Sequence, residues 1–159
     1  MQSSESPGAT APDVATLQLA TRDLVGIALH SVAAATGDVS LVQFRMLWTI
    51  AAIGQSSSAD VATALGVGAS SVTRLADRLQ SSGYLARGSE PTNRRVVTLD
   101  LTEAGHELVT RVLQWREDEL TRVLSQLEPD VRAGMVEGLR AMHRVVGEEY
   151  ASESGPLPL

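Results

Sequence analysis

The sequence contains no cysteine. A chain without cysteine has no disulfide framework, no thiol redox sensor and no thiolate zinc site, and a cytosolic location is the default expectation. It also lacks an apolar run approaching the roughly 18 residues of a membrane span, and no basic-then-apolar leader opens it. We therefore expect neither a membrane partner nor a secretory signal.

Lysine is absent as well, and all thirteen basic residues are arginine, which we interpret as a composition bias. The net charge of −6 argues against a nucleic-acid partner, but the distribution reverses that interpretation. Residues 68–99 hold five arginines and two acids, a local +3, which leaves eight arginines and seventeen acids, or −9, elsewhere. Because screening confines fields to roughly 10 Å at ordinary salt, a basic patch on an acidic body can still bind phosphate.

No catalytic or metal-binding pattern is present. His30, His106 and His143 are scattered, and none has a histidine four residues away. Neither a Gly-x-Ser-x-Gly elbow nor a phosphate-binding loop with its lysine occurs. We predict no enzymatic activity, no metal and no cofactor, and a small helical enzyme is a distant alternative.

The stretch from Val61 to Leu101 organises the chain. A short helix is predicted from the helical spacing of Val61, Ala62 and Leu65, and the glycine-containing break of residues 66–68 ends it. A second helix is predicted from Ala69 to Ser82, with Gly83 ending it. Two short helices joined by a tight turn with glycine are typical of a helix-turn-helix.

The second of these helices is amphipathic. Val72, Leu75 and Leu79 form an apolar stripe that predicts one face against a core. The other face carries short donors and arginines, as expected of a helix in the major groove. The predicted DNA-binding residues here are Ser70, Ser71, Thr73, Arg74 and Arg78. The alternative for the serines is an ordinary exposed polar face. Arg78 is expected to contact phosphate or to lie near Asp77.

A basic hairpin follows. Strands are predicted at residues 84–87 and 96–99, around the turn-rich loop of residues 88–95. This completes a winged helix, whose hairpin tip would reach a minor groove or phosphate. Arg94 is predicted to contact DNA, and Arg95 to meet phosphate beside it or to point back into the hairpin.

The remaining residues predict long helices on either side of this module. We expect tails at residues 1–12 and 151–159, a winged helix-turn-helix lobe at 37–101, and helical dimerisation regions at 13–36 and 102–150. Asp13 is expected to cap the first helix, and Ser40 the central, almost wholly apolar helix of residues 41–53. Residues 56–58 offer further capping hydroxyls. The long helix from Thr102 is predicted to end near Leu127, and the last helix to run from Asp130 to about Tyr150. The fold class is mainly α (α+β).

These long amphipathic helices have more apolar surface than one winged module can bury. A homodimer with twofold symmetry is the commonest closed solution. Such a dimer would place two recognition helices about one DNA turn apart, roughly 34–36 Å, and would read a palindrome in double-stranded DNA.

The order of these motifs resembles the MarR family of bacterial transcription regulators. Residues 40–50 (SLVQFRMLWTI) resemble its second helix, and 72–87 (VTRLADRLQSSGYLAR) its recognition helix and first wing strand. Residues 90–105 (EPTNRRVVTLDLTEAG) resemble its wing and the entry to its long helix. The resemblance, from Asp13 to Tyr150, implies a cytoplasmic, homodimeric winged-helix repressor that is found on the nucleoid when bound to DNA.

The resemblance also implies a small aromatic or lipophilic effector bound between the dimerisation helices and the DNA-binding lobe. The candidate ligand-binding residues are His30, Phe44, Arg45 and Trp48. Core packing is the alternative for Phe44 and Trp48, and a surface position is the alternative for Arg45. The chain departs from the family pattern at Asn93, where the family usually has aspartate, so we expect a looser wing. With the acidic total, Asn93 supports an alternative function, a protein–protein module with weak or lost DNA binding.

Overall fold

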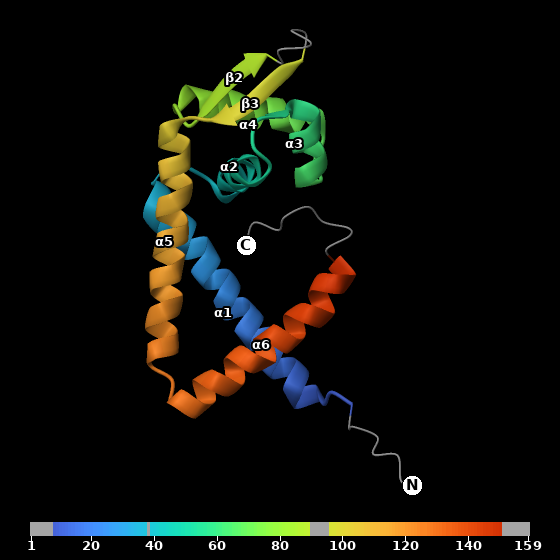
Figure 1. Cartoon of the computed structure of the whole chain (residues 1–159), viewed down its shortest axis with the longest axis vertical. Coiled ribbons are helices and arrows are strands. Elements are labelled where there is room, and N and C mark those ends of the chain that lie inside the picture. Colours follow the sequence, from blue (N-terminus) through green and yellow to red (C-terminus); the bar gives the residue numbers. More distant parts are fainter. Residues whose placement is uncertain (1–7, 38, 90–95, 151–159) are drawn as a thin grey trace.

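The computed structural model describes residues 8–37, 39–89 and 96–150 (Figure 1). The elements are, in order, α1 (Ala11–Thr36), α2 (Leu41–Ile53), β1 (Ser56–Ser57), α3 (Ser58–Leu65), α4 (Ala69–Ser81), β2 (Leu85–Ser89), β3 (Val97–Leu101), α5 (Glu103–Ser125) and α6 (Pro129–Tyr150). The predicted fold class, a mainly helical winged helix-turn-helix with long terminal helices, is confirmed. Within these ranges no helix is long and apolar enough to span a bilayer.

The sheet is small and antiparallel, with the order β1–β3–β2. The hairpin of β2 and β3 was predicted, and its strands run Leu85–Ser89 and Val97–Leu101, one or two residues further along than expected. Strand β1 was not predicted, because Ser56 and Ser57 have no apolar periodicity. Their pairing with Leu99 and Thr98 adds a third strand to the base of the wing.

The hydrophobic core lies beneath this sheet and centres on α2. Phe44, Met46, Leu47 and Ile50 are all buried, so the prediction that the almost wholly apolar helix is central is confirmed. Side chains from α3, α4, the strands and the upper part of α5 complete the core: Val61, Leu65, Val72, Ala76, Leu79, Leu85, Leu99, Leu101, Leu108, Val109 and Val112. The core therefore joins the recognition helix to the long helix α5.

The start of α1 differs from the prediction. The helix begins at Ala11, so two residues assigned to the tail are helical. Asp13 stands in the first turn rather than at the cap, where its carboxylate accepts hydrogen bonds from Thr10 N (2.8 Å) and Thr10 Oγ1 (2.6 Å). These bonds lower the pKa of the Asp13 carboxyl. Thr10 and Asp13 thus form a capping box, in which the Asp13 carboxylate satisfies the backbone N–H of Thr10, the residue before the helix.

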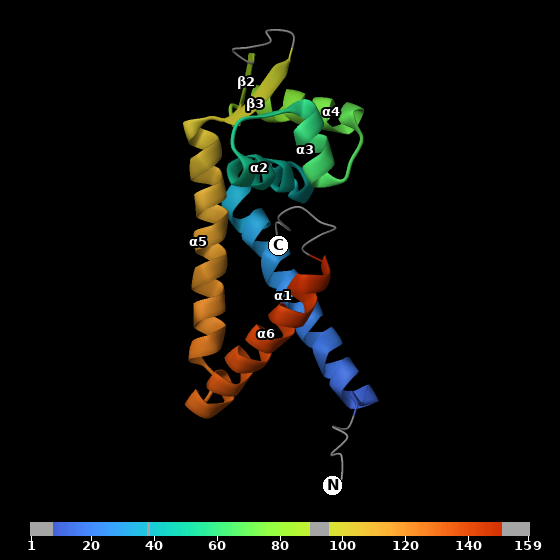
Figure 2. The same cartoon turned by 45° about the vertical axis from the view of Figure 1, so that its right-hand side comes forward.

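The long helices form arms that extend away from the winged lobe (Figures 1 and 2). Helices α1 and α5 pack against each other. Helix α6 leaves the far end of α5 and runs back across α1 without extensive contact with any other element. The arms and the lobe meet where β3 turns into α5.

That junction is a tight backbone joint. The Thr102 hydroxyl donates to Gly83 O (2.6 Å) and accepts from Gly105 N (3.1 Å), while Thr102 N donates to Tyr84 O (3.2 Å). Gly83 has φ 79°, a conformation that glycine adopts at little cost. A Cβ on Gly105 would lie 2.2 Å from Tyr84 O. The start of α5 can therefore approach the end of α4 only because residue 105 has no side chain.

We expect Gly105→Ala to destabilise the fold by about 1–3 kcal/mol, as overpacking in a well-packed interior does, because backbone atoms must move apart. Urea denaturation followed by circular dichroism would measure this. Gly134→Ala in α6, where nothing lies within 4 Å, is the matched control and should be neutral or stabilising. Equal changes in the free energy of unfolding for the two substitutions would contradict the requirement for glycine at residue 105.

Candidate nucleic-acid interface

The recognition helix α4 is positioned by the turn that precedes it. Gly66 closes α3 in the left-handed region with φ 66° and ψ 33°, and α4 begins after Gly68. Val72, Ala76 and Leu79 are buried against the core. The predicted stripe was Val72, Leu75 and Leu79; Leu75 is half-buried, and Ala76, which was not predicted, is buried in addition. These side chains fix which face of α4 points outward.

The outward face carries the predicted DNA-binding residues of α4. Ser70, Thr73, Arg74 and Arg78 are exposed, and Ser71 is half-buried. The Thr73 hydroxyl donates to Ala69 O (3.1 Å), so its oxygen remains free to accept. Among the described residues, neither Arg74 nor Arg78 has an ion pair or side-chain hydrogen bond. Both guanidinium groups therefore keep their donors for another molecule.

The acid on this helix is already paired. Arg87 Nη2 donates to Asp77 Oδ1 (2.6 Å) and lies 3.5 Å from Thr73 O. The bond ties strand β2 of the wing to the middle of α4, and it neutralises the carboxylate between Arg74 and Arg78. On sequence alone, Arg87 is only one of the five arginines of residues 68–99. Ten residues separate it from Asp77, so no helical or strand periodicity relates them.

The tip of the wing, residues 90–95, lies outside the described residues. The predictions for Arg94, Arg95 and Asn93 fall there and stay predictions. The base of the wing is described. Gln55 Nε2 donates to Thr98 Oγ1 (3.2 Å) across it, and a Cβ on Gly88 would meet that same oxygen at 3.0 Å. The two strands are thus closely packed where they leave the lobe.

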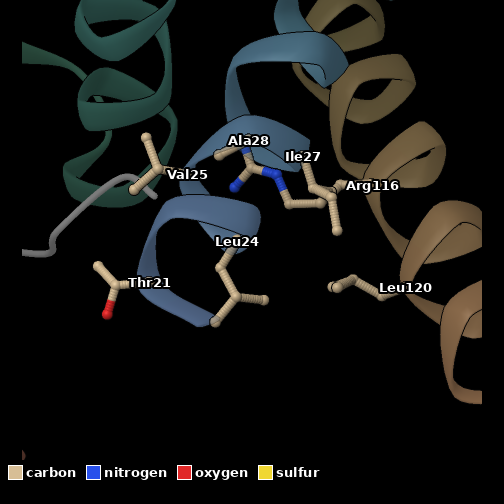
Figure 3. Close-up of a pocket in the computed structure, with 7 residues that line it drawn as sticks. All are labelled: Thr21, Leu24, Val25, Ile27, Ala28, Arg116 and Leu120. Atoms are coloured by element: carbon tan, nitrogen blue, oxygen red, sulfur yellow. The ribbon is translucent and has the colours of Figure 1, made fainter. Parts of the chain in front are cut away.

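The predicted ligand-binding residues are divided between the core and the surface of the described structure. Phe44 is a core side chain, 1% exposed, and its ring centroid lies 6.5 Å from that of the half-buried Trp48. His30 and Arg45 are exposed. An apolar cavity between α1 and α5 is lined by other residues (Figure 3), and the prediction of a ligand site at these four stays a prediction. Packing accounts for the positions of both aromatic rings.

The described ranges also contain no group of three His, Asp or Glu side chains placed to hold a metal ion. The outward face of α4 carries exposed hydroxyl and guanidinium groups. Their chemistry is that of hydrogen-bond donors and cations on a convex helix face, which is suited to contacts with phosphates and base edges.

Comparison with known proteins agrees with this geometry. A MarR family model matches residues 37–96. The HTH-type transcriptional repressor MdtR of Bacillus subtilis is 30% identical over 116 residues, which cover 73% of this chain and 71% of MdtR. The chain belongs to the MarR family. Its predicted place among the family's winged helix-turn-helix transcriptional regulators is confirmed.

Solved structures extend the likeness from the lobe to the arms. The crystal structure of Rv1404 from Mycobacterium tuberculosis has 32% identity and a TM-score of 0.80, covering 89% of this chain and 97% of that one. The transcriptional regulator Tm0710 from Thermotoga maritima has 26% identity and a TM-score of 0.70, covering 87% and 99%. The MarR fold thus accounts for α1, α5 and α6 as well as the winged lobe.

A double-mutant cycle would measure the bond between wing strand and recognition helix. For Asp77→Ala and Arg87→Ala we expect a coupling energy of about 0.2–1 kcal/mol in urea denaturation, since both side chains are partly exposed. The coupling should fall as salt is added. The control is the pair Arg22 and Asp23, which are adjacent in sequence, 3.4 Å apart and largely exposed. Its coupling energy should be smaller. Absence of coupling between Asp77 and Arg87 would contradict the tie.

Proposed function

We propose that this MarR-family regulator acts as a homodimeric repressor that binds palindromic operator DNA through α4 and the wing. The observation that supports this most directly is the outward face of α4. Arg74 and Arg78 are exposed there without a partner among the described residues, while the acid between them is paired with Arg87. A cationic helix face on an acidic protein favours a polyanionic partner.

Each residue of this face has a distinct part in the proposal. Arg74 lies in the first half of α4 and would read a base edge, because the N-terminal residues of a recognition helix contact bases. Arg78, one turn later, would meet phosphate. Ser70, Ser71 and Thr73 supply short donors or acceptors that suit either phosphate or base edges. Arg94 and Arg95 at the wing tip would add flanking contacts.

The dimer would be formed by the arms. Helix α6 spans 22 residues, and none of its side chains with described exposure is buried. It nevertheless carries an apolar face that includes Val131, Met135, Met142, Val145 and Val146. In proteins, amphipathic helices owe most of their stability to the packing of the apolar face. The exposed Val14 and Leu17 of α1 extend the apolar surface.

A second copy of the chain is the partner that best covers these faces. Twofold symmetry lets the same helices of both subunits cover one another, and it would bring two copies of α4 to successive major grooves of a palindrome. In the proposed mechanism a small lipophilic effector shifts this spacing and releases the DNA. The protein would act in the cytoplasm and without enzymatic activity.

Replacing Arg74 tests the DNA contact. We expect Arg74→Ala to weaken binding to operator fragments selected from the source genome by about 1–3 kcal/mol and to relax sequence preference, as loss of a guanine contact does. Fluorescence anisotropy with specific and scrambled duplexes would measure both. Arg111→Ala, an exposed arginine of α5, is the control and should bind normally. Unchanged affinity of Arg74→Ala would remove this residue from the interface.

The oligomeric state tests the role of α6. We expect the wild-type chain to sediment as a dimer, and the double variant Met142→Glu and Val145→Glu to sediment as a monomer. Val145 is 68% exposed within one chain, so the change costs the subunit fold little and acts on the interface. The control Val42→Glu, on an apolar residue of α2 that is 57% exposed, should remain dimeric. A wild-type monomer at micromolar concentration would refute the proposal.

A further inference from the structure

The connector between α2 and α3, residues 54–57, ties the wing to the rest of the lobe. Gly54 ends α2 with φ 75°, and Ser57 caps α3 through reciprocal hydrogen bonds with Asp60. Between these two fixed points, Ser56 and Ser57 pair with β3 as strand β1. The connector therefore joins two helices of the lobe to a strand of the wing.

Thr98 lies at the centre of the sheet, on the face away from the core. It pairs with Ser57 of β1 on one side and with Gly88 of β2 on the other. Its neighbour Leu99 is fully buried in the core, so Thr98 points to the opposite face, because successive side chains of a strand alternate. A side chain on that outer face is expected to be exposed, yet Thr98 is only 8% exposed.

The side chain of Gln55 lies against this outer face. Its Nε2 atom donates to Thr98 Oγ1 at 3.2 Å, a bond between residues 43 positions apart. A Cβ on Gly88 would lie 3.0 Å from that hydroxyl oxygen and 3.5 Å from the same Nε2 atom. The amide of Gln55 therefore packs where β2 has no side chain, and it lies against both strands of the wing from a residue that belongs to neither.

Side-chain contacts thus attach each strand of the hairpin to the lobe. Arg87 joins β2 to Asp77 of α4, and Gln55 joins β3 to the connector. Both strands lie at the end of the molecule that also holds α4 (Figures 1 and 2). Because a two-stranded ribbon is at best marginally stable by itself, its direction relative to α4 depends on attachments of this kind.

We propose that Gln55 is a positioning residue for DNA binding. Its amide holds the wing at the angle from which the hairpin contacts the DNA that flanks the site of α4, and the missing side chain at Gly88 makes room for it. Gln55 acts through the wing and not through a contact of its own with DNA. The inference rests on the proposed DNA-binding function.

The test uses the full chain and two duplexes that carry an operator selected by the wild type from genomic fragments. The short duplex ends at the palindrome, and the long one extends about one helical turn, roughly 10 base pairs, beyond each end. We expect Gln55→Leu to bind the long duplex about threefold to tenfold more weakly than the wild type, the range of one neutral hydrogen bond. It should bind the short duplex almost normally. Fluorescence anisotropy would measure both affinities.

Further variants test the path from Gln55 to the wing. Thr98→Val removes the accepting hydroxyl and should weaken binding to the long duplex as much as Gln55→Leu does. The double variant should be no weaker than either single one, because the same bond is lost. Thr98→Ser keeps the hydroxyl and should bind normally. Arg94→Ala should cost less affinity in the Gln55→Leu background than in the wild type, because the wing is already displaced.

A matched glutamine and a second measurement control for general destabilisation. Gln114→Leu removes an amide that donates to Asp118 within α5 (3.0 Å), and it should leave the affinity for both duplexes unchanged. Circular dichroism would establish that each variant is folded. In the free protein, Gln55→Leu should speed amide hydrogen exchange between β2 and β3 by about threefold or more, whereas Gln114→Leu should not.

Several results would overturn the inference. One is an equal loss of affinity for the two duplexes, and another is additive losses for Gln55→Leu and Thr98→Val. A salt slope that falls by about one unit in Gln55→Leu, with normal binding by Thr98→Val, would show a direct phosphate contact instead. Unchanged hydrogen exchange in the wing would also refute the role of the bond.

The same titrations separate this inference from the proposed function. If the wild type binds neither duplex, the proposed function fails and the role of Gln55 in DNA binding falls with it. If the wild type binds DNA and Gln55→Leu binds equally well, only the positioning role is refuted.

Discussion

The close approach of α5 to the end of α4 is the constraint on which the arrangement of the molecule depends. Thr102 bonds to Gly83 and Tyr84, and Gly105 leaves room for the Tyr84 carbonyl. The recognition helix α4 is thereby fixed to α5, the helix that would set the distance between the two α4 helices of a dimer. Because the backbone contacts and the shared core join the two helices, we expect a small rotation of α5 to move α4 with it.

The local charge of the lobe depends on one ion pair. The protein carries −6 overall, and an acid stands in the middle of α4. The bond from Arg87 to Asp77 removes that charge from the outward face and at the same time ties the wing strand to the helix. Net charge is therefore a poor guide to the partner of this protein, because a field screened within roughly 10 Å depends on local groups.

The arms hold the apolar surface that the lobe does not cover. Helix α6 and the first half of α1 expose it on the outside, where a second subunit is proposed to bury it. Between α1 and α5 it lines a cavity that Arg116 borders. Of the helices that line this cavity, α5 begins at the joint around Gly105.

The sequence by itself determined the elements whose causes are local. The caps at Ser40 and Thr102, the glycine break after Leu65 and the apolar stripe of α4 depend on residues within a few positions of one another, and family resemblance supplied their order. Tertiary structure decided what depends on distant partners. Strand β1, the pair Asp77 and Arg87, and the contact between Ser31 and Arg116, 85 residues apart, exist only once the chain has folded. Periodicity describes one element at a time, whereas a cavity or an ion pair is a property of two elements brought together by the core.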